Sequence, residues 1–372
     1  MRHLHIVSIH IPYPPDYGGA IDEFYRLKAL KELGIQVTLH CFLYGTRAVA
    51  PELEKYCQKV YYYKRAMTLK NAIGSRPFIV RSREDPMLLE NLLKDESPIL
   101  FEGIHTCAFI GEKALSTRLK LVRMHNIEWG YYHYLAEHEP NRLKRMYFRS
   151  ESAKLKRYED HVFTHAQVIL PISHSDTTYF AAHHSRVSHL PPFHGFDSVM
   201  ISTGVGKHVL VHGDFRILDN ARAAIEVAIA ANEEGIPCLI AGKSPSEKMR
   251  RTLQKFSNIR LMPDVSSETM RQLKLDAQMH VVHSENPSGF KIKLLNALFS
   301  GRHVLVQRSI AEGEHLESIT HAFGNRRELQ ALMRKLKDQP VTQDDIKCRE
   351  SLLLPRFANS INAQNLINLI FP

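Results

Sequence analysis

The chain has 372 residues, 44% of them hydrophobic, which is enough for two globular domains with separate cores. It has no apolar run approaching the ~20 residues of a membrane span, and its N-terminal run lacks the small-residue cleavage site of a signal peptide. The formal net charge of +10 favours anionic partners: nucleotide diphosphates, phosphorylated lipids, anionic membrane surfaces or nucleic acid.

The first residues predict a β-loop-α-β unit. Residues 4–11 (LHIVSIHI) have the apolar character of a buried strand, and Pro12–Gly19 (PYPPDYGG) has loop composition. Residues 20–33 predict a helix closed by Gly34, and Gln36–Phe42 predicts the second strand. This order favours a parallel, doubly wound sheet.

The loop before the first helix is a candidate binding element. Gly18 and Gly19 follow the first strand, at the edge where open α/β sheets bind their ligands, and paired glycines let a backbone approach a ligand closely. A helix-entry turn that needs positive φ explains the two glycines equally well. Asp16 and Tyr17, in the same loop, are candidates for contact with an acceptor.

Polar side chains follow two further predicted strands, Ile99–Glu102 and Lys120–Met124. A single histidine at such a position is more often structural than functional. Several polar residues converging on one sheet edge are stronger evidence for a site. The residues brought together in this way are His105, Arg123, His125, Asn126 and Glu128.

A basic, aromatic helical pattern runs over Tyr131–Glu159. Its charges fit a solvated helix face, or a helical hairpin that borders the acceptor site and touches a membrane or an acidic acceptor. The strand Val168–Ile172 follows, and then a stretch of linker composition. We therefore predict an N-terminal domain over residues 1–190, onto which a C-terminal helix of about residues 356–372 packs back, and a second domain over residues 191–355.

The second half repeats the α/β pattern, and its strand ends predict a second site. Gly213 and Lys243 follow two strands, and the segment Ser284–Val306 (SENPSGFKIKLLNALFSGRHVLV) combines a polar loop with a helix and a strand. A loop feeding a helix N-terminus is an anion site, and a bound anion would offset Lys291 and Lys293 in the first turn. The predicted strands are Lys207–Val211, Pro237–Ala241, Ile259–Met262, Met279–Val282 and Val304–Val306.

Taken together, these pieces resemble a GT-B fold glycosyltransferase of the retaining group 1, family 4-like type. The resemblance spans nearly the whole chain and rests on six segments in the same order. They are Pro14–Gly19, Arg123–Ala136 (RMHNIEWGYYHYLA), Tyr158–Ser173, His212–Asn220, Ala241–Ser246 (AGKSPS) and the stretch SGFKIKLLNALFSGRHVLV. The fold implied is α/β, with two Rossmann-like domains whose parallel sheets face a central cleft.

The chain departs from this family in its donor signature. The first glutamate of the family pattern falls on Ser288, with Glu285 or Asn286 near enough to substitute, and the second falls on Asn296. One glycine of the family's GFG falls on Lys291. A variant subfamily with a lysine-rich donor loop fits these changes, and so does a decayed active site.

The resemblance implies transfer of a sugar from a UDP- or GDP-sugar to a glycan or lipid-linked acceptor, in cell-surface polysaccharide or glycoconjugate synthesis, with retention. It implies catalytic roles for His105, Arg123 and His125, with His105 orienting the donor sugar, and acceptor contacts from Asp16, Tyr17, Asn126 and Glu128. We expect no metal or other cofactor, because basic groups can offset the charge of the leaving diphosphate. The donor-binding residues expected are Gly18, Gly19, Gly213, Arg216, Lys243, Ser288, Gly289, Phe290, Lys293 and Asn296.

Three other functions are compatible with the same sequence. A non-catalytic nucleotide- or glycan-binding module fits Ser288 and Asn296, and a GT-B epimerase would share the phosphate site but needs an acid/base pair that the sequence does not reveal. Nucleic-acid binding fits the charge alone, since no RRM, KH, helix-turn-helix or zinc spacing is present. Five dispersed cysteines without a CxxC pair favour a cytoplasmic protein, and the charge is compatible with a peripheral position at the inner face of a membrane.

Overall fold

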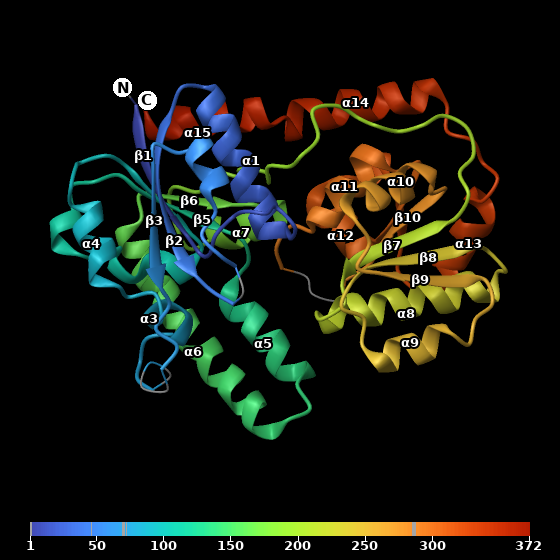
Figure 1. Cartoon of the computed structure of the whole chain (residues 1–372), viewed down its shortest axis with the longest axis horizontal. Helices are drawn as coiled ribbons and strands as arrows, with labels where there is room; N and C mark the ends of the chain where they lie inside the picture. Colours follow the sequence, from blue (N-terminus) through green and yellow to red (C-terminus); the bar gives the residue numbers. More distant parts are fainter. Residues whose placement is uncertain (1, 46, 69–70, 72, 285–287) are drawn as a thin grey trace. The chain divides into compact units, whose positions relative to one another are not determined.

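The computed structural model describes residues 2–45, 47–68, 71, 73–284 and 288–372 (Figure 1). The chain forms two compact units. The first comprises Met1–Gly195, Ser288–Phe290 and Arg356–Pro372, and the second comprises Phe196–Pro287 and Lys291–Pro355. Each unit contains one six-stranded parallel sheet.

The sheet of the first unit has the strand order β3-β2-β1-β4-β5-β6, and all its pairings are parallel. Its central strands are almost wholly buried, as expected for a parallel sheet covered on both faces. The strand order reverses between β1 and β4, and their carboxyl ends therefore form a topological switch point, where doubly wound sheets bind ligands. The strands are β1 (His3–Ser8), β2 (Gln36–Leu43), β3 (Lys59–Lys64), β4 (Ile99–Glu102), β5 (Lys120–Met124) and β6 (Val168–Pro171).

Helices cover both faces of this sheet. On one face α1 packs beside α15, whose Leu366 and Ile367 share a buried cluster with Leu27 and Leu30 of α1. On the other face α3, α4 and α6 pack with the short helix η2. The helices of this unit are α1 (Gly18–Glu32), η1 (Pro51–Lys55), α3 (Phe78–Arg81), α4 (Pro86–Leu92), η2 (Ile104–Phe109), η3 (Lys113–Leu115), α5 (Glu128–His138), α6 (Arg142–His165), α7 (His174–Ala181) and α15 (Asn359–Ile370).

The basic helical pattern predicted after β5 forms a hairpin of α5 and α6 (Figure 1). The residue before Pro140 is extended, because a proline disfavours helical backbone at the residue before it. Asn141 then caps α6 by accepting hydrogen bonds from the backbone N–H groups of Leu143 and Lys144. The two helices are joined by the Ser152 hydroxyl, which donates to the carbonyl of Trp129 at 2.8 Å.

The second unit repeats the pattern with the strand order β12-β11-β10-β7-β8-β9, so its switch point lies between β7 and β10. Its last strand, β12, has three residues and is absent from the sequence prediction. The strands are β7 (Val209–Asp214), β8 (Cys238–Lys243), β9 (Ile259–Pro263), β10 (Met279–Val282), β11 (His303–Gln307) and β12 (His321–Phe323).

The helices of the second unit also lie on both faces of its sheet. Figure 1 shows α8 and α9 on one face and α10 and α11 on the other, and α13 packs on α8. Among the described residues, no helix combines the length and the apolarity that crossing a membrane requires. The helices are α8 (Leu218–Glu233), α9 (Glu247–Leu253), α10 (Ser267–Asp276), α11 (Ile292–Ser300), α12 (Arg308–Glu314), η4 (Glu317–Ile319), α13 (Arg326–Leu336) and α14 (Gln343–Phe357).

Candidate functional site

A buried ionic network lies at the switch point of the first unit. Arg123, on β5, donates from Nε and Nη2 to the two carboxylate oxygens of Asp22, at 2.8 and 2.7 Å. Asp22 lies on α1, and Arg26 lies one turn after it on the same helix. Arg26 forms an ion pair with Glu102 at the end of β4. The other oxygen of Glu102 lies 2.9 Å from Nε2 of His125. Two carboxylates and two guanidiniums are thus paired inside the unit, and the histidine at its end keeps 15% of its side chain exposed.

Arg123 is enclosed within the first unit, and its predicted catalytic role remains a prediction. Its side chain is 0% exposed, and its remaining donors reach the carbonyls of Leu190 and Pro191 at 3.1 Å each. These partners give the guanidinium a structural role in the described chain. Burial favours the neutral form of Asp22, but the adjacent guanidiniums of Arg123 and Arg26 outweigh it and hold the pKa of Asp22 well below its usual range.

The atoms of Asp22, Glu102 and His125 lie close enough together to hold a metal ion. The two guanidiniums already supply the positive charge that these carboxylates need. The expectation of a metal-free site remains a prediction.

A second layer of polar groups surrounds His105, which follows β4. Its Nε2 lies 3.8 Å from a carboxylate oxygen of Glu128 at the start of α5. Among the described residues, His105 Nδ1, His10 Nε2 and Glu23 Oε1 are buried and have no hydrogen-bond partner. Buried polar groups are nearly always satisfied, so these three atoms are candidates for hydrogen bonds to a bound ligand.

Burial shifts the acids and bases of this layer toward their neutral forms. Burial raises the pKa of Glu128 to about 7, and burial followed by the charge of Glu102 raises that of Glu23 well above its usual range. Burial lowers the pKa of His10 to about 3 and lowers that of His105 well below its usual range. Neutral acids and neutral imidazoles can both donate to and accept from sugar hydroxyls.

The Glu128→Gln variant tests this environment through the pH dependence of stability. The folded carboxyl binds its proton more tightly than the unfolded one, whose pKa is 4.5, so Glu128 lowers the free energy of unfolding progressively as the pH rises from about 4.5 to about 7. We expect E128Q to be more stable than the parent by up to about 3 kcal/mol at pH 8 and equally stable at pH 4, in urea unfolding at each pH. Glu137→Gln, at an exposed position of the same helix, is the control, and equal stabilities of E128Q and the parent at pH 8 would contradict this environment.

The predicted glycine loop is held by an arginine that the sequence prediction missed. Arg47 donates to the carbonyls of Ile11 and Pro14 at 3.0 Å each, forms an ion pair with Asp16, and lies over the ring of Tyr17. The sequence around Arg47 carries no motif that marks this role. Asp16 is therefore already paired, and its predicted acceptor contact and that of Tyr17 remain predictions.

Gly18 and Gly19 are the first residues of α1. Neither has positive φ, so the helix-entry turn considered for them is excluded. A Cβ on Gly19 would meet His10 Cε1 at 3.5 Å, which is ordinary contact, so packing within the chain does not require a glycine there. Approach of a ligand to this backbone remains a prediction.

The predicted donor residues Ser288, Gly289 and Phe290 belong to the first unit. The Ser288 hydroxyl accepts a hydrogen bond from the backbone N–H of Ile127 at 2.8 Å, and the N–H of Gly289 donates to Asp176 at 3.0 Å. Gly289 has φ +73, and a Cβ there would lie 2.2 Å from Oδ1 of Asn126. In this structure the backbone N–H of Gly289, which was predicted to bind a phosphate, donates to Asp176. Glu285 and Asn286, considered as substitutes for the family glutamate, lie outside the described residues.

The switch point of the second unit carries Lys293. Its Nζ donates to Oδ1 of Asn220 at 3.1 Å and to the carbonyl of His283 at 2.7 Å. Asn220 lies against Gly213 at the end of β7, where a Cβ would come within 3.3 Å of its side chain. Burial lowers the pKa of Lys293 to about 8. The structure thus brings Gly213 and Lys293 together through an asparagine that was not among the predicted site residues.

The remaining predicted donor residues lie at the same sheet edge or on α11. Lys243 pairs in register with Asp214 across β7 and β8, and Arg216 forms an ion pair with Asp214. Both cationic side chains are exposed. Asn296 is half-buried on α11. Lys291 is the N-cap of α11, and Lys293 lies in its first turn.

The sequence prediction also missed the charged residues that α1 contributes to the buried ionic network. Asp22 and Arg26 have the i, i+4 spacing of an ordinary surface ion pair, and nothing in the sequence marks them as buried. Asp219 and Ser284, hydrogen-bonded at 2.6 Å beside Lys293, were missed as well. The signal that could have found Ser284 is its position directly after the predicted strand Met279–Val282.

Comparison with solved structures identifies the architecture. The chain is 10% identical to S. aureus TarM, a mutant in complex with Fondaparinux, alpha-GlcNAc-glycerol and UDP, with a TM-score of 0.68 and 100% of both chains covered. It is 12% identical to Anabaena HepE in complex with UDP, with a TM-score of 0.68 and 99% of both chains covered. The chain has the GT-B fold.

This GT-B chain is also similar in sequence to one uncharacterized protein. It is 25% identical over 332 residues to an uncharacterized 44.6 kDa protein in the cps region of Klebsiella pneumoniae, which covers 84% of each chain. No protein-family model matches the GT-B chain.

Proposed function

We propose that the chain is a glycosyltransferase that moves a sugar from a UDP-sugar to a glycan or lipid-linked acceptor, with release of UDP. The observation that carries this proposal is the half-buried ammonium of Lys293 at the switch point of the second sheet. A partly desolvated cation at that edge is suited to a diphosphate. UDP is chosen over GDP because two solved structures with this fold contain UDP.

In this proposal the second unit binds the UDP. Departure of the nucleotide builds negative charge on its outer phosphate, and fixed positive groups stabilise that charge best where water is largely excluded. Lys293 is half-buried, and Lys243 and Arg216 add exposed positive charge at the same sheet edge. Gly213 allows the backbone to approach the nucleotide closely.

The first unit supplies the groups that bind sugar hydroxyls. His105, His10 and Glu23 each present a buried atom without a hydrogen-bond partner among the described residues, and His125 and Glu128 lie in the same layer. We assign His105 to a hydroxyl of the transferred sugar. Retention of anomeric configuration belongs to the proposal, and NMR of the product tests it.

A lipid-linked acceptor is supported by the first turns of α6. Leu143 and Met146 are 77% and 67% exposed there, next to the basic residues Arg142, Lys144 and Arg145. Apolar and basic side chains together on one exposed helix favour contact with an anionic membrane surface. The similarity to a protein of a cps region supports a role in cell-surface polysaccharide synthesis.

Acceptor-dependent release of UDP is the decisive experiment. Purified chain is first titrated with UDP, GDP and their sugars by calorimetry, where we expect UDP to bind and GDP to bind more weakly. With a UDP-sugar that binds, release of UDP is then followed with and without candidate glycan and lipid-linked acceptors. Release that rises with acceptor supports the transferase, and failure of UDP and UDP-sugars to bind contradicts the donor site.

One structural observation favours a second function, a GT-B nucleotide-sugar epimerase. The sequence revealed no carboxylate pair, but the fold places Glu23 and Glu102 near enough for the charge of one to raise the pKa of the other. An epimerase would release UDP from its own sugar without an acceptor. A binding module would bind UDP without any turnover, so the same assay separates all three.

A further inference from the structure

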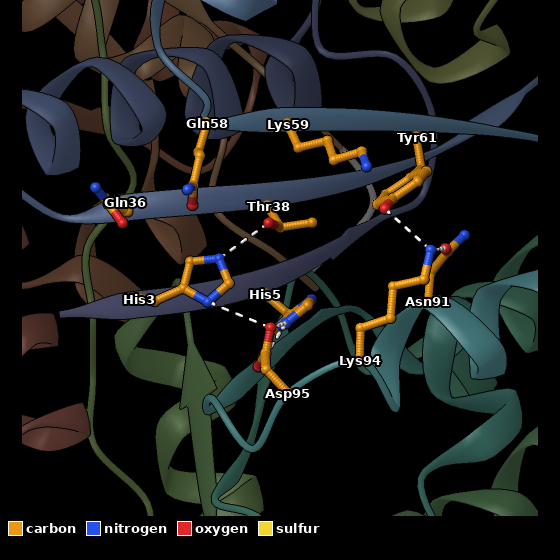
Figure 2. A pocket seen from close by; sticks show the side chains of 10 residues that line it. All are labelled: His3, His5, Gln36, Thr38, Gln58, Lys59, Tyr61, Asn91, Lys94 and Asp95. Carbon is orange, nitrogen blue, oxygen red and sulfur yellow. Dashed lines mark hydrogen bonds and ion pairs between the residues drawn. The ribbon is translucent and has the colours of Figure 1, made fainter. Parts of the chain in front are cut away.

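A polar pocket lies at the amino-terminal edge of the first sheet, opposite the switch point. Its volume is about 510 Å³, and its walls come from the first residues of β1, β2 and β3 and from the segment around α4 (Figure 2). The proposed glycosyltransferase site uses none of these residues. The residues that line the pocket therefore call for a separate explanation.

Two histidines and one aspartate converge at one side of this pocket, as Figure 2 shows. His3 and His5 stand two residues apart on β1 and so point to the same face of the sheet. Asp95 comes from the turn before β4, where the N–H of Ser97 donates to its Oδ1 at 2.7 Å. Asp95 Oδ2 lies 2.9 Å from Nε2 of His5 and 3.6 Å from Nδ1 of His3.

We propose that His3, His5 and Asp95 form a binding site for a divalent transition-metal ion, with Zn²⁺ as the best fit. Two imidazoles and one carboxylate are a ligand set that zinc uses, with bonds of about 2.0–2.2 Å. Tetrahedral ligands at that bond length stand about 3.3 Å apart. The separations of 2.9 and 3.6 Å bracket this value. The fourth position opens to the pocket, where water completes the coordination.

The second nitrogen of each histidine is already positioned by a partner. His3 Nε2 lies 2.9 Å from the hydroxyl of Thr38. His5 Nδ1 lies 2.9 Å from Nε2 of His40, and His40 Nδ1 lies 2.8 Å from the hydroxyl of Tyr63. Histidines that bind metals are oriented by such outer hydrogen bonds, which also fix the tautomer that faces the ion. The partners that a metal site needs behind its ligands are therefore present.

Metal binding requires one rearrangement of protons, and the hydrogen-bond chain accommodates it. Without an ion, His5 donates from Nε2 to Asp95 and accepts at Nδ1 from His40, which accepts in turn from Tyr63. With an ion on Nε2, His5 donates from Nδ1 to His40, and His40 donates to the oxygen of Tyr63. The hydrogen bonds of His40 to His5 and to Tyr63 reverse, whereas the bond of His5 Nε2 to Asp95 and that of His3 Nδ1 to the Ser97 hydroxyl, at 2.8 Å, give way to the ion.

Positive charges near the site do not occupy its ligand atoms. Arg118 lies 3.8 Å from Oδ1 of Asp95, the oxygen that faces away from His3, and its guanidinium donates to the carbonyls of Ser97 and Leu92. Lys94 donates to Asn91 at 2.6 Å. Oδ2 of Asp95 therefore remains directed at the two imidazoles.

Zinc and cobalt titrations of the metal-free full chain test the site. We expect one high-affinity Zn²⁺ ion per chain by calorimetry, and a Co²⁺ complex with the visible absorption of a four-coordinate ion. His3→Gln and Asp95→Asn should each weaken Zn²⁺ binding more than 100-fold, and Thr38→Ala should weaken it about 10–100-fold. His133→Gln is the matched control, because His133 and Glu137 form an exposed pair at 3.3 Å on α5.

The same experiment distinguishes a lost site from a lost fold. Each variant is compared with the parent by circular dichroism and by thermal midpoint, and Zn²⁺ should raise the midpoint of the parent and of H133Q but not that of H3Q or D95N. Unchanged Zn²⁺ affinity in folded H3Q and D95N would overturn the site, as would absence of binding to the parent. UDP plays no part in these measurements, so their outcome is independent of the glycosyltransferase proposal.

Discussion

Arg123→Met is expected to lower the free energy of unfolding by about 3–5 kcal/mol, the cost of breaking a buried ion pair by removing one partner. Arg123 holds both oxygens of Asp22 and two backbone carbonyls, and its guanidinium lies over the ring of Phe193. Without it, Asp22 keeps one guanidinium partner, Arg26, at 3.2 Å. Urea unfolding monitored by circular dichroism measures the loss.

The exposed Arg157→Met variant on α6 is the control, with an expected change within about 0.5 kcal/mol. The pH dependence of the free energy of unfolding gives a second, independent test. The depressed pKa of Asp22 contributes stability that is present at neutral pH and is lost as the pH falls through the acid range, and R123M should show a smaller acid-side loss. An R123M protein with unchanged stability and no transferase activity would contradict the structural role and favour the predicted catalytic one.

Lys293→Ala is expected to weaken UDP binding by about 1.5–3 kcal/mol, which is roughly 10- to 150-fold. Of its three N–H donors, two are directed at acceptors among the described residues, Asn220 and His283, which leaves a third for a phosphate oxygen. Because the pKa of Lys293 is lowered to about 8, its charge is lost as the pH rises through that value. UDP affinity of the parent should therefore fall above pH 8, and K293A should lack that fall.

Lys248→Ala is the matched control for this experiment, because Lys248 is an exposed lysine of the same unit on α9. Calorimetry at pH 7 and pH 9 on the parent, K293A and K248A gives both the affinities and their pH dependence. A K293A protein that is folded and binds UDP as tightly as the parent would remove the diphosphate from this sheet edge. That result would not affect the assignment of the GT-B fold.

Most of the fold follows from the apolar runs of the sequence. A parallel strand buried on both faces is a continuous apolar segment ending in polar residues, and Ile99–Glu102, Lys120–Met124 and Met279–Val282 were predicted with the bounds that the structure has. The strand β12 was missed because three residues, His-Ala-Phe, carry too little pattern to stand out.

The candidate site could be predicted only where it depends on strand ends. His105 and His125 follow strands, so topology brings them near one switch point. The inward direction of Asp22, Glu23 and Arg26 depends on which face of α1 meets the sheet, and charged residues on a helix usually predict its solvated face. The ion pair of Arg123 was missed for a related reason: its position at the end of a strand was predicted correctly, but its partner Asp22 on α1 could not be predicted.

The packing of α15 on α1 has a consequence for how the protein is made. The core of the first unit contains Ala363, Leu366, Ile367 and Ile370, which are translated after every residue of the second unit. On the ribosome, the N-terminal part of the first unit therefore has an exposed apolar face until α15 is made, while the second unit can already form its own core. Nascent chains of this protein would thus fold in the reverse of the usual N-terminal-first order, and the early half would depend longest on chaperones.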